Sequence, residues 1–217
     1  LDASGYVFRA YHAVPALSSA QGEPTNAVYG LTAMLLKLLH ERQPVLLAAA
    51  LDTSGPSFRK ELYPAYKANR PPLPADLKPQ LGRCRQLIEA YGIATFEQPG
   101  LEADDCIATL VRRARDHQLK VVIVSADKDL LQLVGPDVVM YDSMRERVFG
   151  VAETIEKMGV APTQVRDLLA LTGDSSDNVP GVPSVGPKTA ADLLRSYGDL
   201  EGVFAHIEDI SRKAIKA

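Results

Sequence analysis

The chain has 217 residues, of which 46% are apolar and 24% are charged. These shares argue against a disordered or fibrous protein, and the lack of any apolar run near about eighteen residues argues against a membrane-spanning helix. The net charge of −3, taken alone, argues against nucleic acid as a partner. The two cysteines are far apart and form no C-x-x-C pair, so they indicate neither a disulfide framework nor a zinc site and fit a reducing, cytoplasmic setting.

The order of the predicted elements over the first 150 residues indicates an α/β fold. Continuous apolar runs at 45–51 and 121–125 are typical of strands buried in a parallel sheet. The other predicted elements are amphipathic helices over 27–41, 79–91 and 103–117 and weaker strands over 93–96 and 138–141. Leu1 reads as the last residue of a strand, so we expect a fragment trimmed at its front.

After residue 150 the pattern changes to helices separated by Pro and Gly. The predicted helices cover 151–158, 163–171 and 189–196. We therefore expect an α/β core over 1–150 followed by a helical region over 151–217.

Nine carboxylates stand at places where a chain usually turns. Each alone has a structural explanation, because Asp is a common turn former and acids favour the first turn of a helix. As a group they suggest more, because ligands of open α/β sheets bind beyond the carboxyl ends of the strands. Asp2, Asp52 and Asp127 all follow apolar runs. The nine acids are Asp2, Asp52, Glu102, Asp104, Asp105, Asp127, Asp129, Asp174 and Asp177.

Carboxylates at this density repel one another unless cations compensate their charge. Oxygen ligands with no converging Cys or His favour Mg²⁺ or Mn²⁺ over zinc. Two such ions can activate a water and stabilise an in-line displacement at phosphorus, so phosphodiester hydrolysis is the predicted reaction. Removing nine negative charges from −3 leaves +6, so the rest of the chain is basic and nucleic acid becomes a plausible partner.

A basic stripe lies within 57–85, a segment that contains seven Lys or Arg residues and only two acidic residues. Lys67 and Arg70 are three residues apart, so on a helix they would share a face and could meet phosphate. Tyr63 and Tyr66 lie among these basic residues, a mixture typical of nucleic-acid binding. A solvated helix face would explain the same charges, and the sequence leaves both interpretations open.

The segment 181–189 reads GVPSVGPKT and looks at first like a P-loop. Pro187 separates Gly186 from Lys188 and removes one backbone N–H, and no strand precedes the segment, so nucleotide hydrolysis is not predicted. A glycine-rich hairpin between two helices, with backbone amides facing a DNA phosphate, fits better. A plain helix-to-helix connector is the alternative.

Several segments together resemble the 5′ nuclease domain of bacterial DNA polymerase I, within the flap endonuclease superfamily. The matching segments are LDASGYVFRAYHA (1–13), GEPTNAVYG (22–30), SFRKELYPAYKANRPPLP (57–74), GLEADDCIATL (100–110), VSADKDLLQLV (124–134) and LTGDSSDNVPGVPSVGPKTAADLL (171–194). The resemblance implies a PIN-like core with a mostly parallel sheet flanked by helices, and a helical arch at about 57–85 through which a single strand passes. It also implies a helix-hairpin-helix region with a K⁺ site.

Carried over residue by residue, the resemblance divides the nine acids between two metal sites. The first site would hold Asp2, Asp52, Glu102 and Asp104, and the second Asp105, Asp127, Asp129, Asp174 and Asp177. Lys67 and Arg70 match residues that contact the scissile phosphate, which makes them the catalytic candidates. The expected DNA contacts are Arg59, Tyr63, Lys67, Arg70, Gly181, Val182, Ser184, Val185, Gly186, Lys188 and Thr189.

These observations predict a structure-specific 5′-3′ exonuclease and flap endonuclease that uses Mg²⁺ or Mn²⁺ and leaves 5′-phosphate products. The expected partners are branched, flapped or nicked DNA with DNA or RNA 5′ ends, and a polymerase domain on the same full-length chain, in the bacterial cytoplasm at the nucleoid. Two alternatives remain. One is a non-catalytic, structure-specific DNA-binding module whose acids only cap helices and turns; the other is a Mg²⁺-dependent phosphatase, which would leave the basic stripe and the hairpin without a role.

Overall fold

The computed structural model describes residues 1–210, and these separate into two compact units. The first, called here the sheet unit, comprises Leu1–Phe58, Pro71–Asp127 and Tyr141–Arg147. The second, called the helical unit, comprises Arg59–Arg70, Lys128–Met140 and the described residues from Val148 onward. No helix in the described part of the chain is both long enough and apolar enough to cross a membrane.

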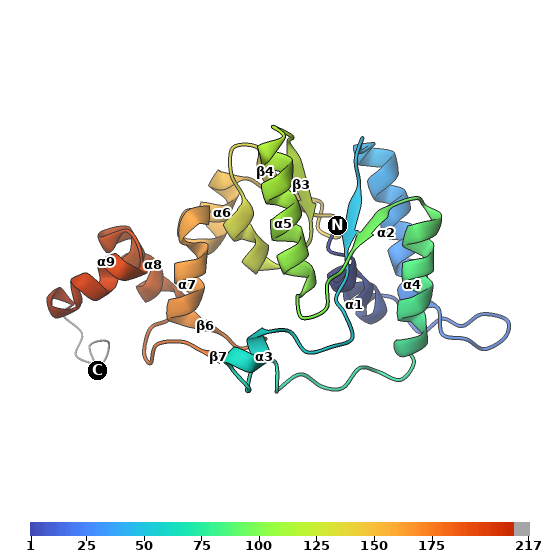
Figure 1. Cartoon of the computed structure of the whole chain (residues 1–217), viewed down its shortest axis with the longest axis horizontal. Helices are drawn as coiled ribbons and strands as arrows, with labels where there is room; N and C mark the ends of the chain where they lie inside the picture. Colours follow the sequence, from blue (N-terminus) through green and yellow to red (C-terminus); the bar gives the residue numbers. More distant parts are fainter. Residues whose placement is uncertain (211–217) are drawn as a thin grey trace. The chain divides into compact units, whose positions relative to one another are not determined.

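The sheet unit is built from strands flanked by helices (Figure 1). Its helices are α1 (Ala3–Ala13), α2 (Asn26–Arg42), α4 (Lys78–Ala90) and α5 (Ala103–Asp116). Its strands are β1 (Ala48–Ala50), β2 (Ala94–Phe96) and β3 (Val121–Val124), together with residues of β4 (Val138–Asp142) and β5 (Arg147–Phe149). The predicted α/β alternation is therefore confirmed.

The beginning of the chain lies inside the sheet. β1 and β2 pair in parallel, with Ala48 opposite Ala94. The terminal amino group of Leu1 donates to Ala48 O over 2.8 Å, and the N–H of Asp2 donates to Val124 O over 3.0 Å. Leu1 and Asp2 thus connect β1 to β3, and β3, β4 and β5 follow in that order. This arrangement places Asp2 among the strand ends.

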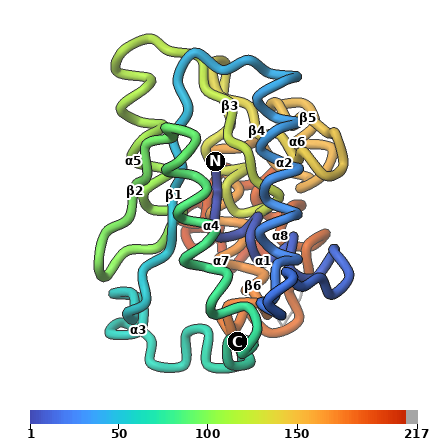
Figure 2. Tube along the Cα trace, turned by 90° about the vertical axis from the view of Figure 1, so that its right-hand side faces the viewer, coloured from blue at the N-terminus to red at the C-terminus, as the bar shows by residue number. Residues whose placement is uncertain are grey.

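The core of the sheet unit lies where α2 packs against α1 and α4 (Figure 2). Leu31, Leu35 and Leu38 of α2 recur at helical spacing and are all buried. α1 approaches α2 closely at Gly30, where an added Cβ would lie 2.7 Å from Ala10 Cβ. The remaining buried members of this core are Ala3, Tyr6, Val7, Ala27, Ala49, Leu77, Cys84, Ile88, Ile93, Val124 and Tyr141.

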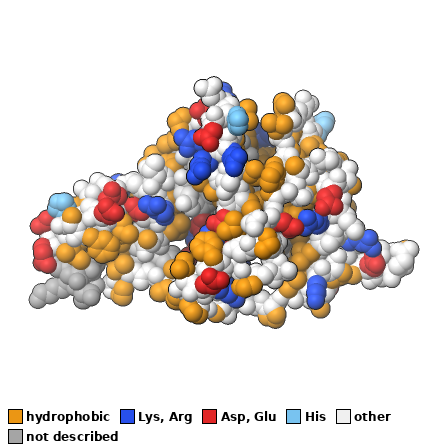
Figure 3. Space-filling view, viewed as in Figure 1, with side chains coloured by type: hydrophobic (Ala, Val, Ile, Leu, Met, Phe, Trp, Pro, Cys, Tyr) orange, Lys and Arg blue, Asp and Glu red, His pale blue; other side chains and the backbone are white. Residues whose placement is uncertain are grey.

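Helix α5 packs on β1 and β3 with one face and carries charge on the other. Its buried residues are Ala103, Cys106, Ile107 and Val111. The residues Arg112, Arg113 and Arg115 near its end are exposed, and basic side chains gather over this helix in Figure 3. This division into an apolar and a charged face matches the amphipathic pattern that predicted the helix.

The helical unit consists of short helices and one small ribbon. Its elements are α3 (Arg59–Leu62), the 3₁₀ helices η1 (Lys128–Leu133), η2 (Pro162–Gln164) and η3 (Ile207–Asp209), the helices α6 (Val151–Met158), α7 (Val165–Thr172), α8 (Pro187–Tyr197) and α9 (Leu200–Ala205), and the strands β6 (Gly173–Asp174) and β7 (Val179–Pro180). α7 packs against α8 and η1, and α8 packs against α9. The ribbon needs glycine, because Gly173 has φ +70° and an added Cβ there would lie 2.3 Å from the backbone N of Gly181.

The structure differs from the sequence predictions in two places of the sheet unit. The strand predicted over 45–51 is shorter, because Gln43 ends α2 with a left-handed φ of 42° and the chain then bends at Val45 and Leu46. Val45 is consequently 97% exposed rather than paired in the sheet. α1 was not predicted, because it follows Asp2 directly, with no connecting loop to mark its start.

Candidate metal centre and nucleic-acid interface

Six of the nine acids lie in the sheet unit, at the ends of strands and at the start of α5. Asp52 follows β1 and Asp127 follows β3, while Asp2 ends the short segment that joins these two strands. The backbone N–H of Ala103, at the start of α5, donates to Asp52 Oδ1 over 2.8 Å. The strand ends therefore bring these carboxylates to one edge of the sheet, as the order of the elements predicted.

The environment of Asp2 shows how close the carboxylates are. Its side chain is 7% exposed, and burial raises the pKa of its carboxyl group. Hydrogen bonds from Ser125 and from the backbone of Gly5 lower that pKa, while repulsion from Asp127 and Asp52 raises it further, and the net pKa lies above the ordinary value. A cation at this edge would offset the repulsion.

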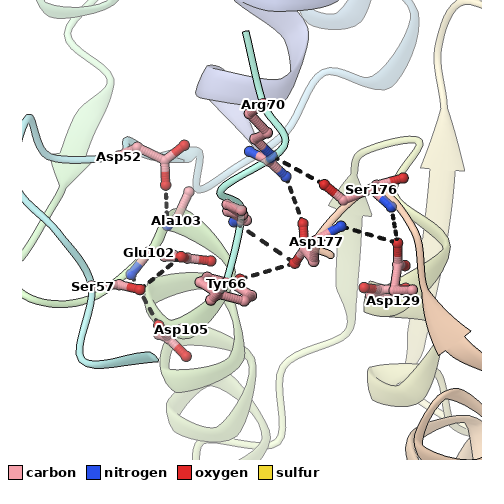
Figure 4. Close-up of polar contacts among 12 residues, drawn as sticks. Asp52, Ser57, Tyr66, Arg70, Glu102, Ala103, Asp105, Asp129, Ser176 and Asp177 are labelled. Atoms are coloured by element: carbon pink, nitrogen blue, oxygen red, sulfur yellow. Dashed lines mark hydrogen bonds and ion pairs between the residues drawn. The ribbon is translucent and has the colours of Figure 1, made fainter. Parts of the chain in front are cut away.

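The first turn of α5 holds three more of the acids, Glu102, Asp104 and Asp105. The N–H of Glu102 donates to Asp105 Oδ2 over 2.9 Å, which is half of a capping box. The hydroxyl of Ser57 donates to Glu102 Oε1 over 2.9 Å (Figure 4). These contacts are also what the structural explanation of the acids expects, so they do not by themselves distinguish a metal ligand from a helix cap.

The residues present fit a hard cation in their chemistry. The candidate metal ligands at this edge are all carboxylate oxygens, which Mg²⁺ and Mn²⁺ favour. Within residues 1–210, no three Asp, Glu, His or Cys side chains stand close enough together to hold one ion. Asp52 and Asp127 are exposed while Asp2 is buried, and these three carboxylates would be among the ligands of such an ion. The metal-binding role of all six acids stays a prediction.

The other three acids, Asp129, Asp174 and Asp177, lie in the helical unit. Lys128 Nζ lies 2.7 Å from Asp174 Oδ2 and 4.0 Å from Asp129 Oδ1. Burial alone would raise the pKa of Asp174, but the hydrogen bonds from Lys128 and from the N–H of Ser176 outweigh it and lower that pKa. Asp174 therefore stays ionised here with a protein cation as its counterion.

Asp177 pairs with both of the basic side chains that were predicted to contact the scissile phosphate. Arg70 Nη2 lies 2.7 Å from Asp177 Oδ1, and Lys67 Nζ lies 3.9 Å from Oδ2. The hydroxyl of Tyr66 donates to the same Oδ2 over 2.9 Å (Figure 4). The N–H of Lys67 also donates to the backbone carbonyl of Asp177, over 2.8 Å. A predicted metal ligand and the two predicted catalytic cations thus meet within the helical unit.

The prediction that Lys67 and Arg70 share a face of a helix is wrong. α3 ends at Leu62, Pro64 follows, and Lys67 has a left-handed φ of 53°. These features break any helical path, and the two cations lie at the two ends of one turn, in which the N–H of Arg70 donates to Lys67 O over 3.3 Å. What aligns them is the shared carboxylate of Asp177.

The remaining candidates for DNA contact lie in and just after α3, and between β7 and the start of α8. Arg59 lies in α3 and Tyr63 is exposed just after it. Residues 181–186 connect β7 to α8, with Gly186 as the cap residue of α8, and Lys188 and Thr189 lie in the first turn of that helix. Lys188 is exposed.

The hairpin was expected to present its amides to phosphate, and two of them are used inside the protein. The N–H of Val182 donates to Leu171 O over 2.8 Å, and that of Val185 donates to Val182 O over 3.1 Å. Ser184 adopts a left-handed φ of 65° between them. Val182 and Val185 therefore shape the turn in this structure. The contacts of Gly181, Ser184, Gly186, Lys188 and Thr189 with DNA stay predictions.

Sequence reasoning missed the partners of the acids. Ser4, Ser57 and Ser125 each hydrogen-bond to an acid or to its backbone, and Lys128 pairs with Asp174. A serine two residues before Asp127 and a lysine between Asp127 and Asp129 were visible. No rule of sequence spacing pairs this serine with Asp2 or this lysine with Asp174.

Comparison with known proteins places this chain among nucleases. A family model described as "5'-3' exonuclease, N-terminal resolvase-like domain" matches residues 1–159. A second, described as "5'-3' exonuclease, C-terminal SAM fold", matches residues 160–217. Together the two models account for both the strand-containing and the helical parts of the sequence.

Curated relatives share much of the sequence. The chain is 48% identical to DNA polymerase I of Rhizobium leguminosarum, a match that covers 98% of this chain and 22% of the relative. It is 41% identical to the 5'-3' exonuclease of Aquifex aeolicus, a match that covers 100% of this chain and 75% of the relative. The chain therefore spans about a fifth of the polymerase and three quarters of the exonuclease.

Solved structures of bacteriophage T5 proteins share the fold. T5 5'-exonuclease with bound zinc matches with a TM-score of 0.82 at 22% identity, covering 99% of this chain and 81% of that one. The T5 D15 flap endonuclease, in a complex with DNA and metal ions, matches with a TM-score of 0.80 at 22% identity, covering 99% and 80%. At this identity the likeness establishes the fold.

Proposed function

The chain belongs to the 5′-3′ exonuclease family, enzymes that hydrolyse phosphodiester bonds, and we propose that it cleaves flapped or nicked DNA with the help of Mg²⁺ or Mn²⁺. The observation that carries the proposal is the gathering of Asp2, Asp52 and Asp127 at one edge of the sheet, where burial, and to a smaller extent repulsion from Asp127 and Asp52, raises the pKa of Asp2. Such a cluster is costly unless a cation balances it.

The proposed roles follow the chemistry of each side chain. Asp2, Asp52, Glu102 and Asp104 would hold a first ion; for Asp105, Asp127, Asp129, Asp174 and Asp177 a role at a second ion rests on the resemblance. When bound, the ions supply an activated water and compensate the charge that develops at phosphorus. Hydrolysis that expels the 3′-oxygen leaves a 5′-phosphate on the product.

The basic residues would position the substrate. Lys67 and Arg70 lie on turns of the helical unit and carry the positive charge that a scissile phosphate requires. The hairpin 181–189 would hold the duplex backbone, with a K⁺ ion as a further expected ligand. Because these groups act at different points of the DNA, they should affect rate and affinity differently.

The wider role rests on the relatives. The resemblance suggests removal of RNA primers during replication and a part in repair, in the bacterial cytoplasm. The match to DNA polymerase I supports a polymerase domain on the same full-length chain. We further propose that residues 1–150 form a catalytic core with an arch at about 57–85, and that residues 151–217 form a DNA-binding region.

A non-catalytic DNA-binding module is the second candidate. It is favoured by the capping contacts of Asp52, Glu102 and Asp105, which would exist without any metal. In that case the acids would be needed for folding and the chain would bind branched DNA without cutting it.

One assay separates the two candidates. A 5′-labelled flap DNA, with a blunt duplex of the same sequence as control, is incubated with metal-depleted protein and then with added Mg²⁺ or Mn²⁺. We expect release of a 5′ fragment only from the flap and only with metal, and its loss with EDTA. Binding without cleavage at every metal concentration would support the module, and full cleavage after exhaustive metal removal would refute the metal mechanism.

A further inference from the structure

The hydroxyl of Ser125 links two of the acids at the sheet edge. Ser125 follows β3 and is 0% exposed. Its Oγ donates to Asp2 Oδ2 over 2.7 Å. The same Oγ accepts the backbone N–H of Asp127 over 3.1 Å. All three residues belong to the sheet unit.

The chemistry of a hydroxyl fixes the direction of both bonds. A serine has one hydrogen to donate and lone pairs to accept with. A backbone N–H can only donate, so Oγ must accept from Asp127, and its single hydrogen is then left for the carboxylate of Asp2. The other oxygen of Asp2, Oδ1, accepts the N–H of Gly5 over 2.8 Å. Each carboxylate oxygen of Asp2 therefore has one oriented partner.

From this geometry we propose that Ser125 is a positioning residue for the metal centre. It holds the side chain of Asp2 in one orientation and sets the turn on which Asp127 leaves β3. The inference rests on the proposed function, since it concerns how the chain places two of the acids assigned to metal. Nothing in it requires Ser125 to touch the ion or the DNA.

The position of Asp2 matters because Mg²⁺ demands near-octahedral geometry. Groups that orient a ligand through a hydrogen bond typically change metal affinity or activity about 10- to 100-fold when they are removed. A purely structural explanation is that Ser125 only satisfies buried polar groups. That explanation predicts a loss of stability with unchanged metal binding in the part that remains folded.

Ser143 provides a matched control in the same unit. It is 5% exposed, and its hydroxyl lies 3.0 Å from the hydroxyl of Tyr6. Ser143→Ala therefore removes one buried hydroxyl and its hydrogen bond to Tyr6, whereas Ser125→Ala removes one buried hydroxyl and two hydrogen bonds, both to residues among the nine acids. The hydroxyl of Ser143 hydrogen-bonds to none of those acids. The pair separates loss of a buried hydrogen bond from loss of ligand positioning.

The experiment measures binding of Mn²⁺ alone to the full chain by electron paramagnetic resonance of the free ion. Variants are Ser125→Ala, Ser125→Thr and Ser143→Ala, each shown to be folded by circular dichroism. We expect Ser125→Ala to weaken Mn²⁺ binding about 10-fold or more, Ser143→Ala to stay within about 2-fold of wild type, and Ser125→Thr to recover binding because it keeps the hydroxyl. Equal Mn²⁺ affinity in Ser125→Ala and Ser143→Ala would overturn the inference.

Single-turnover cleavage of a flap, titrated with Mn²⁺, distinguishes this failure from failure of the proposed function. We expect the Mn²⁺ midpoint of Ser125→Ala to shift upward by the same factor as its affinity. If wild type binds Mn²⁺ and cleaves while Ser125→Ala behaves like Ser143→Ala, the positioning role alone is refuted. If wild type neither binds Mn²⁺ nor cleaves, the proposed function and the inference both fall.

Discussion

Replacing Asp2 with Asn removes a buried charge while keeping the size of the side chain. Asp2 is 7% exposed and caps α1 by accepting the N–H of Gly5. An Asn amide oxygen can accept the same N–H, and its amide nitrogen can donate to Ser125 Oγ, which has lone pairs to accept it. The cap should therefore survive the substitution, which removes the charge and the acceptor for the hydroxyl hydrogen of Ser125.

The consequence for stability depends on metal. Without metal, burial and the repulsion from Asp127 and Asp52 make the ionised carboxylate unfavourable, so Asp2→Asn should be as stable as wild type or more stable at pH 7. Because the folded pKa of Asp2 is raised, its protonated form stabilises the fold at low pH and that contribution is lost as pH rises above the ordinary value of 3.8 through the raised pKa. Asp2→Asn should lack this part of the pH dependence.

With metal, the order should reverse. Mg²⁺ at about 100 times its Kd stabilises a folded protein by roughly 2.7 kcal/mol. For a chain of this size each kcal/mol raises Tm by roughly 2 to 4 °C, so wild type should gain about 5 to 11 °C. Asp2→Asn should gain much less, and its cleavage rate should fall by on the order of 10² or more.

Thermal unfolding followed by circular dichroism, with and without Mg²⁺, measures these effects directly. Ser143→Ala serves as the control for a buried polar substitution in the same unit, and it should keep the full response to Mg²⁺. If Asp2→Asn responds to Mg²⁺ as wild type does and cleaves at a similar rate, the carboxylate of Asp2 is only a helix cap and the reasoning is refuted.

Two further predictions concern the cations of the helical unit. Lys67→Ala and Arg70→Ala should each lose about 2 to 4 kcal/mol of transition-state stabilisation, measured as a lower single-turnover rate, while flap affinity changes little. Lys188→Ala should instead weaken binding and flatten its salt dependence. Near wild-type rates for Lys67→Ala and Arg70→Ala at saturation would refute the phosphate assignment. Lys128→Met should raise the pKa of Asp174, which Lys128 lowers in the wild-type fold. A lowered folded pKa stabilises the fold above pH 3.8, and this contribution is lost as the pH falls through the lowered pKa. The substitution should shrink that contribution by no more than about 1 kcal/mol, because the Lys128 side chain is 42% exposed. Urea unfolding at neutral and acidic pH checks this, and an unchanged pH dependence would contradict it.

The sequence predicted the parts of the fold that follow from periodicity. The apolar spacing of Leu31, Leu35 and Leu38 predicted α2, and the charged and apolar faces of 103–117 predicted α5. The gathering of acids at one edge followed from strand ends alone, because parallel strands end at the same edge of a sheet.

Other parts depend on contacts that no local pattern encodes. Ser125 and Asp2 are 123 residues apart in the chain, and a single serine carries no periodic signal. The alignment of Lys67 with Arg70 depends on a left-handed residue and on Asp177, which lies 107 residues beyond Arg70. A helical spacing rule therefore gave the wrong geometry for two residues whose grouping it suggested.

Anomalous diffraction from crystals soaked in Mn²⁺ would test the central claim most directly, namely that the carboxylates at the sheet edge hold the metal. We expect an anomalous peak bound by a carboxylate oxygen of Asp2, with Asp52 and Asp127 turned toward it, and no such peak in crystals of Asp2→Asn grown and soaked alike. An empty sheet edge in wild-type crystals soaked with Mn²⁺ at concentrations that support cleavage would contradict the account.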